Sequence, residues 1–126
     1  MNLIYVAAGG ALGSVCRYLM TQLCTRWCGY TFPYGTLLVN ILGSLAMGML
    51  IGWLAKTSTG FEPLRLLIGV GFLGGFTTFS AFSLDVVTLF ERGEMLQVLL
   101  YLFASVTVSV LALLAGLYVM RMAGAA

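Results

Sequence analysis

Four long apolar segments make up most of this chain, and three short breaks separate them. The breaks lie at residues 26–33, 56–62 and 91–94. Each contains charged residues together with glycine or proline, as turns at a water interface do. Because a helix needs about 20 predominantly apolar residues to cross a bilayer, the sequence predicts an all-α integral membrane protein with one transmembrane domain, residues 1–126. Its expected spans are residues 2–24, 34–55, 63–90 and 95–121.

The composition excludes most other classes of protein. Of the 126 residues, 61% are hydrophobic and 8% are charged, whereas soluble domains have about 45–50% and about 25%. A net charge of +2 provides no polycationic face for nucleic acid. The chain has no histidine, so it lacks the commonest metal ligand and general base. A soluble globular fold, a disordered tail and a coiled coil are excluded, and an enzyme is the least expected function.

The basic residues are divided almost evenly between the two sides of the predicted bundle. Lys56, Arg65 and Arg121 lie on the side of the N-terminus, and Arg26 and Arg92 lie on the other. Lysine and arginine in short loops normally direct those loops to the cytoplasm. The near-even count leaves two interpretations open: an N-terminus weakly directed to the cytoplasm, or insertion both ways followed by antiparallel pairing. Four short helices enclose little by themselves, so we expect an oligomer.

Glycine spacing predicts close helix packing and, in the third span, a break. Gly9 and Gly13, like Gly48 and Gly52, have the GxxxG spacing that lets helix backbones approach in lipid. In the third span, four glycines fall within residues 69–75 and hydroxyl residues follow them. Unwound backbone at this depth is buried in protein or lines a cavity, and its carbonyls can coordinate a cation. The alternative is a continuous, closely packed helix.

Polar side chains within the spans are candidates for function. Arg17 and Asp85 are costly charges in a membrane, although both could also extend to the interface. Tyr101, Ser105 and Ser109 are spaced i, i+4, i+8 and share one helix face. This spacing indicates either a wetted track or serines that bond to carbonyls of their own helix.

Aromatic residues in the third span suggest the kind of ion. Phe76, Phe79 and Phe82 recur every three residues, and they either pack as apolar side chains or present positive ring edges to an anion. Neutral donors predominate in the spans, and no carboxylate lies centrally, so an anion is favoured. Two other functions stay open. A small multidrug transporter would need an acid that the first span lacks, and a non-transporting assembly subunit would use the glycines for packing alone.

Three motifs follow one another in the first three spans: residues 9–18 (GGALGSVCRY), 35–43 (GTLLVNILG) and 74–83 (GGFTTFSAFS). In these motifs, and over nearly its whole length, the chain resembles the small fluoride channels of bacteria, the Fluc or CrcB family. The resemblance implies a passive, fluoride-selective channel that exports cytoplasmic fluoride down its electrochemical gradient and protects the cell from fluoride toxicity. It also implies an antiparallel, dual-topology homodimer with two pores in the bacterial inner membrane.

The resemblance also assigns roles to particular residues. It implies a fluoride pathway at Asn40, Phe79, Phe82, Ser83, Tyr101, Ser105 and Ser109. It implies that the carbonyls of Gly74 and Thr77, from both subunits, hold a structural sodium ion (Na+) at the dimer interface, because hard oxygen ligands suit such a cation. Further candidates for the pathway or its support are Arg17, Thr36 and Asp85. Asp85 is shorter than the glutamate expected from the family, and Thr36 is its expected neighbour.

Overall fold

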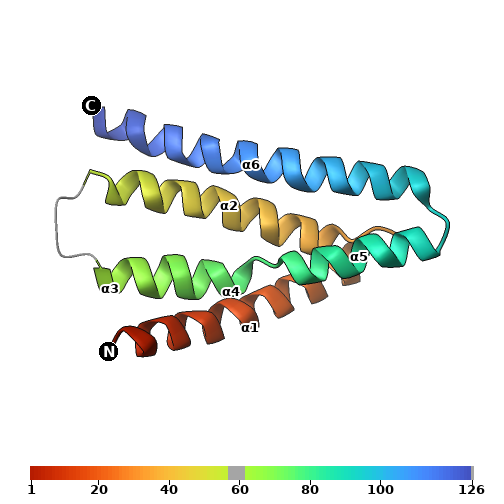
Figure 1. Cartoon of the computed structure of the whole chain (residues 1–126), viewed down its shortest axis with the longest axis horizontal. Helices are drawn as coiled ribbons and strands as arrows, with labels where there is room; N and C mark the ends of the chain where they lie inside the picture. Colours follow the sequence, from red (N-terminus) through yellow and green to blue (C-terminus); the bar gives the residue numbers. More distant parts are fainter. Residues whose placement is uncertain (57–61, 126) are drawn as a thin grey trace.

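The computed structural model describes residues 1–56 and 62–125, and the regular elements in this part are all helices. The elements are α1 (Asn2–Cys28), α2 (Tyr34–Leu54), α3 (Glu62–Leu64), η1 (Arg65–Leu73), α4 (Gly74–Phe76), α5 (Phe79–Glu91) and α6 (Met95–Ala125). Figure 1 shows that the helices run side by side, with α2 beside α6 and α1 beside the third span. The start of α1 and the end of α6 lie at the same end of the bundle (Figure 1), as an even number of crossings requires.

The expected number of spans is confirmed. In the described residues, four helices are long and apolar enough to cross a membrane, with hydropathies between 1.4 and 2.5. α1 continues to Cys28, whereas the sequence predicted an end at residue 24. The helix ends there because Gly29 has a φ of +84°, a backbone conformation that glycine readily adopts after a helix. The charged Arg26 in its last turn therefore lies on the helix and not in the following turn.

Glycines bring the backbone of α1 into direct contact with the third span. A Cβ atom on Gly9 would overlap the carbonyl oxygen of Leu67, and one on Gly13 would overlap that of Phe72. Both carbonyls belong to η1. The predicted packing role of these two glycines is therefore confirmed, and the two helices can lie this close because neither glycine carries a side chain.

A second set of glycines joins α2 to α6. A Cβ atom on Gly48 would overlap the carbonyl oxygen of Leu113, and one on Gly52 would lie 2.8 Å from the Cβ atom of Met120. Gly116 on α6 packs against α2 in the same way, although no glycine lies four residues from it in the sequence. The four-helix bundle thus consists of two helix pairs that are packed backbone to backbone.

The third span widens and then breaks. η1 consists of π-helical turns, and the N–H of Gly74 donates to the carbonyl of Gly69. Such turns are rare and often occur near functional sites. The chain then becomes extended at Thr77 (φ −86°, ψ 159°) and Thr78 (φ −155°, ψ 123°). The break therefore falls on the two threonines, while the glycines before them remain helical in α4.

Candidate functional site: a broken helix beside a polar groove

Asn40 on α2 holds the broken segment with both ends of its side-chain amide. Its Nδ2 donates to the carbonyl oxygen of Thr78 at 3.0 Å, and its Oδ1 accepts the N–H of Thr78 at 2.8 Å. These bonds satisfy backbone groups that would otherwise be unpaired in the membrane. One N–H of the Asn40 amide remains available, because the amide group has two donors.

Arg17 and Thr78 satisfy the two helix ends at the break. Arg17 Nε on α1 donates to the carbonyl oxygen of Gly75 at 2.9 Å, which places a cation at the carboxyl end of α4. Thr78 Oγ1 accepts the N–H of Ala81 at 3.1 Å and caps the start of α5. The half-buried Arg17 therefore has a structural partner within the bundle, whereas the alternative had its side chain extend to the interface.

The break also releases carbonyl groups, among them those of Gly74 and Thr77. In a continuous helix the N–H of Thr78 would bond to Gly74, but it bonds to Asn40 instead. The N–H of Ala81 would bond to Thr77, but it bonds to the side chain of Thr78. The carbonyl oxygens of Gly74 and Thr77 therefore lose their helical donors, and hard oxygen atoms of this kind suit an alkali-metal cation.

A groove of about 350 Å³ lies beside the break. It is lined by Asn40, Ser44, Thr77, Thr78, Phe79, Phe82, Ser105, Val106, Ser109 and Val110. The structure thus brings together most of the residues for which a fluoride pathway is implied. Ser44 also lines the groove and was not among the predicted residues. Its position four residues after Asn40 could have indicated this, because residues four apart share one face of α2.

Two serine hydroxyls in the groove have no hydrogen-bond partner. The Oγ atoms of Ser105 and Ser109 are buried, and within the described part of the chain neither makes a hydrogen bond. The alternative that these serines bond to carbonyls of their own helix does not describe this structure. A buried hydroxyl without a partner costs free energy, so both groups are suited to receive a ligand.

The two phenylalanines of the groove differ in exposure. Phe79 is 77% exposed in the single chain, whereas Phe82 is only 7% exposed. Their ring centroids lie 5.5 Å apart with an interplanar angle of 49°, and the Phe82 ring lies 5.1 Å from that of Tyr101. Phe82 is therefore held by the core between α5 and α6, while Phe79 projects away from it.

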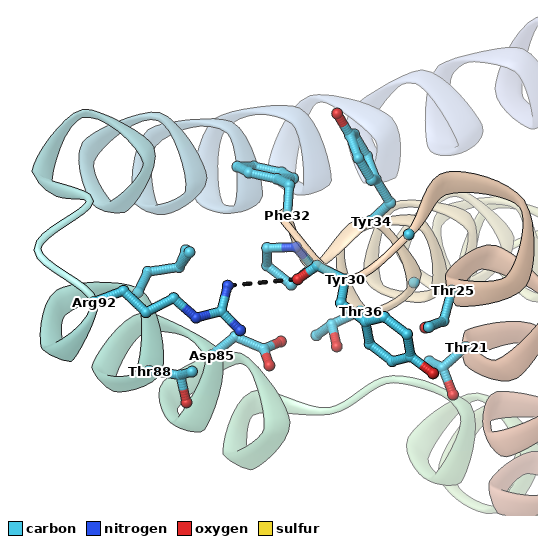
Figure 2. Close-up of a pocket in the computed structure, with 13 residues that line it drawn as sticks. Thr21, Thr25, Tyr30, Phe32, Tyr34, Thr36, Asp85, Thr88 and Arg92 are labelled. Atoms are coloured by element: carbon cyan, nitrogen blue, oxygen red, sulfur yellow. Dashed lines mark hydrogen bonds between the residues drawn. The ribbon is translucent and has the colours of Figure 1, made fainter.

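A second pocket of about 220 Å³, which we call the terminal pocket, lies where the end of α1, the start of α2 and the end of α5 meet. Figure 2 shows the side chains that surround it, with Thr36, Asp85 and Arg92 on one side and Thr21, Thr25 and Tyr30 on the other. Thr36 and Asp85 thus line one pocket together.

Tyr101 contacts one lining residue of each cavity. Its side chain is fully buried, and its hydroxyl donates to Asp85 Oδ2 at 2.9 Å. Asp85 lines the terminal pocket, whereas Phe82, which packs against the Tyr101 ring, lines the groove. Tyr101 itself does not line the groove.

Ser83, like Tyr101, is a predicted pathway residue that does not line the groove. Its Oγ donates to the carbonyl oxygen of Phe79 at 3.0 Å, within α5, and it lines neither the groove nor the terminal pocket. The break explains this position: α5 starts anew at Phe79, and Ser83 lies one turn further along the helix.

The groove presents positive partial charges, and the end of α4 presents negative partial charges. The start of α5, with its positive helix end, lies on the groove together with the hydroxyls and the remaining Asn40 N–H. The released carbonyls present negative partial charge at the end of α4. The groove can therefore hold a small anion, and the carbonyls can hold a cation.

Comparison with known proteins finds one matching family model and many similar sequences. The family model described as "CrcB-like protein, Camphor Resistance (CrcB)" matches residues 4–117. A "Fluoride-specific ion channel FluC" of Rhizobium johnstonii is 52% identical over 118 residues, which cover 94% of each chain. The protein of the same name from Sphingopyxis alaskensis is 52% identical, with 96% of this chain and 97% of that one covered. "Fluoride-specific ion channel FluC 2" of Nitrobacter hamburgensis is 46% identical, with 96% and 98% covered.

Proposed function

Because this chain belongs to the CrcB family, we propose that it is a fluoride-specific channel that exports cytoplasmic fluoride passively. It is a multi-pass protein of the bacterial inner membrane, and its mechanism needs no enzymatic step. The observation that carries the proposal is the groove that Phe79, Phe82 and two unpartnered serine hydroxyls line together. Phenyl edges and neutral donors attract an anion without holding it too tightly to leave.

The chemistry of the groove answers the main difficulty of conducting fluoride. Removing the hydration shell of a small ion is costly in a medium of low dielectric constant. The Ser105 and Ser109 hydroxyls and the free N–H of Asn40 can replace the lost water donors. Hydrogen fluoride crosses membranes as a neutral molecule and ionises inside, so an anion pathway lets the trapped fluoride leave and protects the cell.

We further propose that two copies assemble as an antiparallel homodimer with two pores. The exposed Phe79 ring lies beside a groove that one chain leaves open, which suits contact with a second copy. The near-even distribution of loop arginines and lysines supports insertion in both orientations. The oppositely inserted copies would then each contribute a groove.

The released carbonyls support a structural Na+ at the centre of that dimer. Gly74 and Thr77 provide two oxygen ligands per chain, so two copies provide four, a number closer to what hard cations require. When bound, the ion would hold the two broken helices together and add positive charge near the grooves. Arg17 donates a hydrogen bond to the adjacent carbonyl of Gly75, so that carbonyl is satisfied without a bound cation.

Fluoride release from proteoliposomes tests the channel proposal. We expect vesicles loaded with potassium fluoride to release it rapidly when valinomycin carries potassium out, because the anion must follow the cation. A fluoride electrode in the external solution measures the rate. Matched vesicles loaded with potassium chloride should release little chloride.

Absence of fluoride release from properly reconstituted protein would contradict the channel and favour an assembly subunit. Release that requires an opposing proton gradient would instead favour a coupled transporter. If chloride is released as fast as fluoride, the channel is not selective for fluoride.

Cys28 tests the antiparallel arrangement, because it is exposed at the end of α1. In a variant that carries Cys16→Ser and Cys24→Ser, a membrane-impermeant maleimide added to intact spheroplasts should label about half of the copies, as dual insertion requires. The remainder should react only after the cells are opened. Labelling of all copies, or of none, before opening would contradict dual topology.

The unfolding temperature of the purified dimer tests the proposed sodium site. The dimer should unfold at a higher temperature in sodium chloride than in choline chloride of equal concentration, because a ligand bound by the folded state stabilises it by mass action. Equal unfolding temperatures in the two salts would contradict the sodium site while leaving the channel intact.

A further inference from the structure

Arg92 is a charged residue of the terminal pocket to which the proposed pathway assigns no role. It is the first residue after α5, and its Nη1 donates to the carbonyl oxygen of Tyr30 at 3.4 Å. Tyr30 precedes it by 62 residues and lies between α1 and α2. Figure 2 shows the Arg92 side chain reaching from α5 across the pocket toward Tyr30. This contact holds a positive charge over the pocket, although Arg92 is itself exposed.

Arg92 and Asp85 are the charged residues that matter for the electrostatic potential in the terminal pocket. Glu91 and Glu94 are its neighbours in sequence, but neither lines the terminal pocket. The charged residues that line it, among those the structure describes, are Arg92 and Asp85, and no ion pair joins them. Asp85 instead accepts the hydroxyl of Tyr101. Without Arg92 the pocket would therefore carry the negative charge of Asp85 alone, which repels an anion.

One side chain, Tyr101, contacts a lining residue of the terminal pocket and a lining residue of the groove. The Tyr101 hydroxyl donates to the Asp85 carboxylate at 2.9 Å, and its ring centroid lies 5.1 Å from that of Phe82. From Tyr101 the hydroxyl positions Ser105 and Ser109 continue along α6 into the groove. A fluoride ion that leaves the groove past Tyr101 enters the terminal pocket, where hydroxyl groups from three helices line the wall.

We propose that Arg92 sets the fluoride conductance by concentrating the anion in the terminal pocket; this inference rests on the proposed function as a fluoride channel. Its guanidinium offsets the Asp85 charge and keeps the local potential favourable to fluoride. A charged pocket with walls of low dielectric constant focuses the field and raises the local concentration of counter-ions. Because the contact with Tyr30 uses one of five N–H donors, the remaining donors can face the ion.

The test compares initial rates of fluoride release for Arg92→Gln, Arg92→Lys and Arg26→Gln in neutral phosphatidylcholine vesicles. Glutamine removes the charge and keeps an N–H donor, and lysine keeps the charge without the guanidinium group. Arg26 is the matched control, because it lies at the same end of the bundle, is exposed and does not line the terminal pocket. Each rate is measured at about 0.05 M and about 1 M ionic strength, between which the Debye length shrinks several-fold.

At low ionic strength we expect Arg92→Gln to reduce the rate about three- to tenfold, and Arg92→Lys and Arg26→Gln to stay within about twofold of the unchanged protein. At high ionic strength the difference should fall below about twofold, because salt screens the field. Equal rates for Arg92→Gln and Arg26→Gln would overturn the inference and leave Arg92 a surface charge. A reduction that persists at high ionic strength would also overturn it, since the contact with Tyr30 would then be structural. If the unchanged protein releases no fluoride, the proposed function fails instead.

Discussion

Replacing Phe79 by isoleucine should reduce fluoride release about 100-fold, which corresponds to a loss of about 2.7 kcal/mol of stabilisation at the conduction barrier. The reason is electrostatic, because an isoleucine side chain has no positive ring edge to present to the ion. Phe79 is 77% exposed in the single chain, so the substitution removes little packing within the subunit. The free energy of unfolding of the subunit should therefore change by less than about 0.5 kcal/mol.

Two other phenylalanines on α5 serve as comparisons for this result. Phe90 is 60% exposed and does not line the groove, so Phe90→Ile should leave the rate of fluoride release unchanged. Phe82→Ile should reduce release and also destabilise the protein by about 1–2 kcal/mol, because the Phe82 ring packs against Tyr101 in the core. Release at the unchanged rate from a folded dimer with Phe79→Ile would remove the role assigned to the ring.

Replacing Gly13 by alanine should destabilise the protein by at least about 2 kcal/mol, although alanine has the better helix propensity. The added Cβ atom would overlap the backbone carbonyl oxygen of Phe72, and a backbone atom cannot move aside as a flexible side chain does. α1 and η1 would have to separate, and Arg17 would move with α1 away from the Gly75 carbonyl. Thermal unfolding in detergent measures the loss.

Gly10→Ala is the matched control for this substitution. Gly10 lies on the same helix, and a Cβ atom there would come no closer than 3.9 Å to the neighbouring helix, at the carbonyl oxygen of Gly71. The control should therefore be neutral or slightly stabilising within the subunit. If Gly13→Ala unfolds at the same temperature as Gly10→Ala, the backbone contact between α1 and η1 is not as close as described.

Much of the fold follows from local features of the chain. The four spans depend on the length and hydropathy of each apolar segment, and both quantities can be counted without knowing any contact. Gly9, Gly13 and Gly48 lie at helix contacts as their spacing predicts, because residues four apart share one helix face. The end of α1 was less predictable, since Arg26 suggested an interface whereas Gly29 terminates the helix.

The candidate site depended on contacts between distant parts of the chain. The glycine pair and the threonines after it predicted a break without fixing its residues, and the extended residues are Thr77 and Thr78. Their position follows from Asn40, which is 38 residues away from Thr78 and pairs with its backbone. No local pattern contains that bond.

The sequence by itself determined a membrane protein with four spans, and its inventory of neutral donors favoured an anion. Only the tertiary structure decided which of those donors are used. It commits the Asn40 amide to the backbone, leaves the Ser105 hydroxyl unpartnered, directs Ser83 to its own helix and adds Ser44 to the groove. The physical reason is that hydropathy and helix periodicity are properties of one segment, whereas a hydrogen bond requires two groups from different segments at about 3 Å.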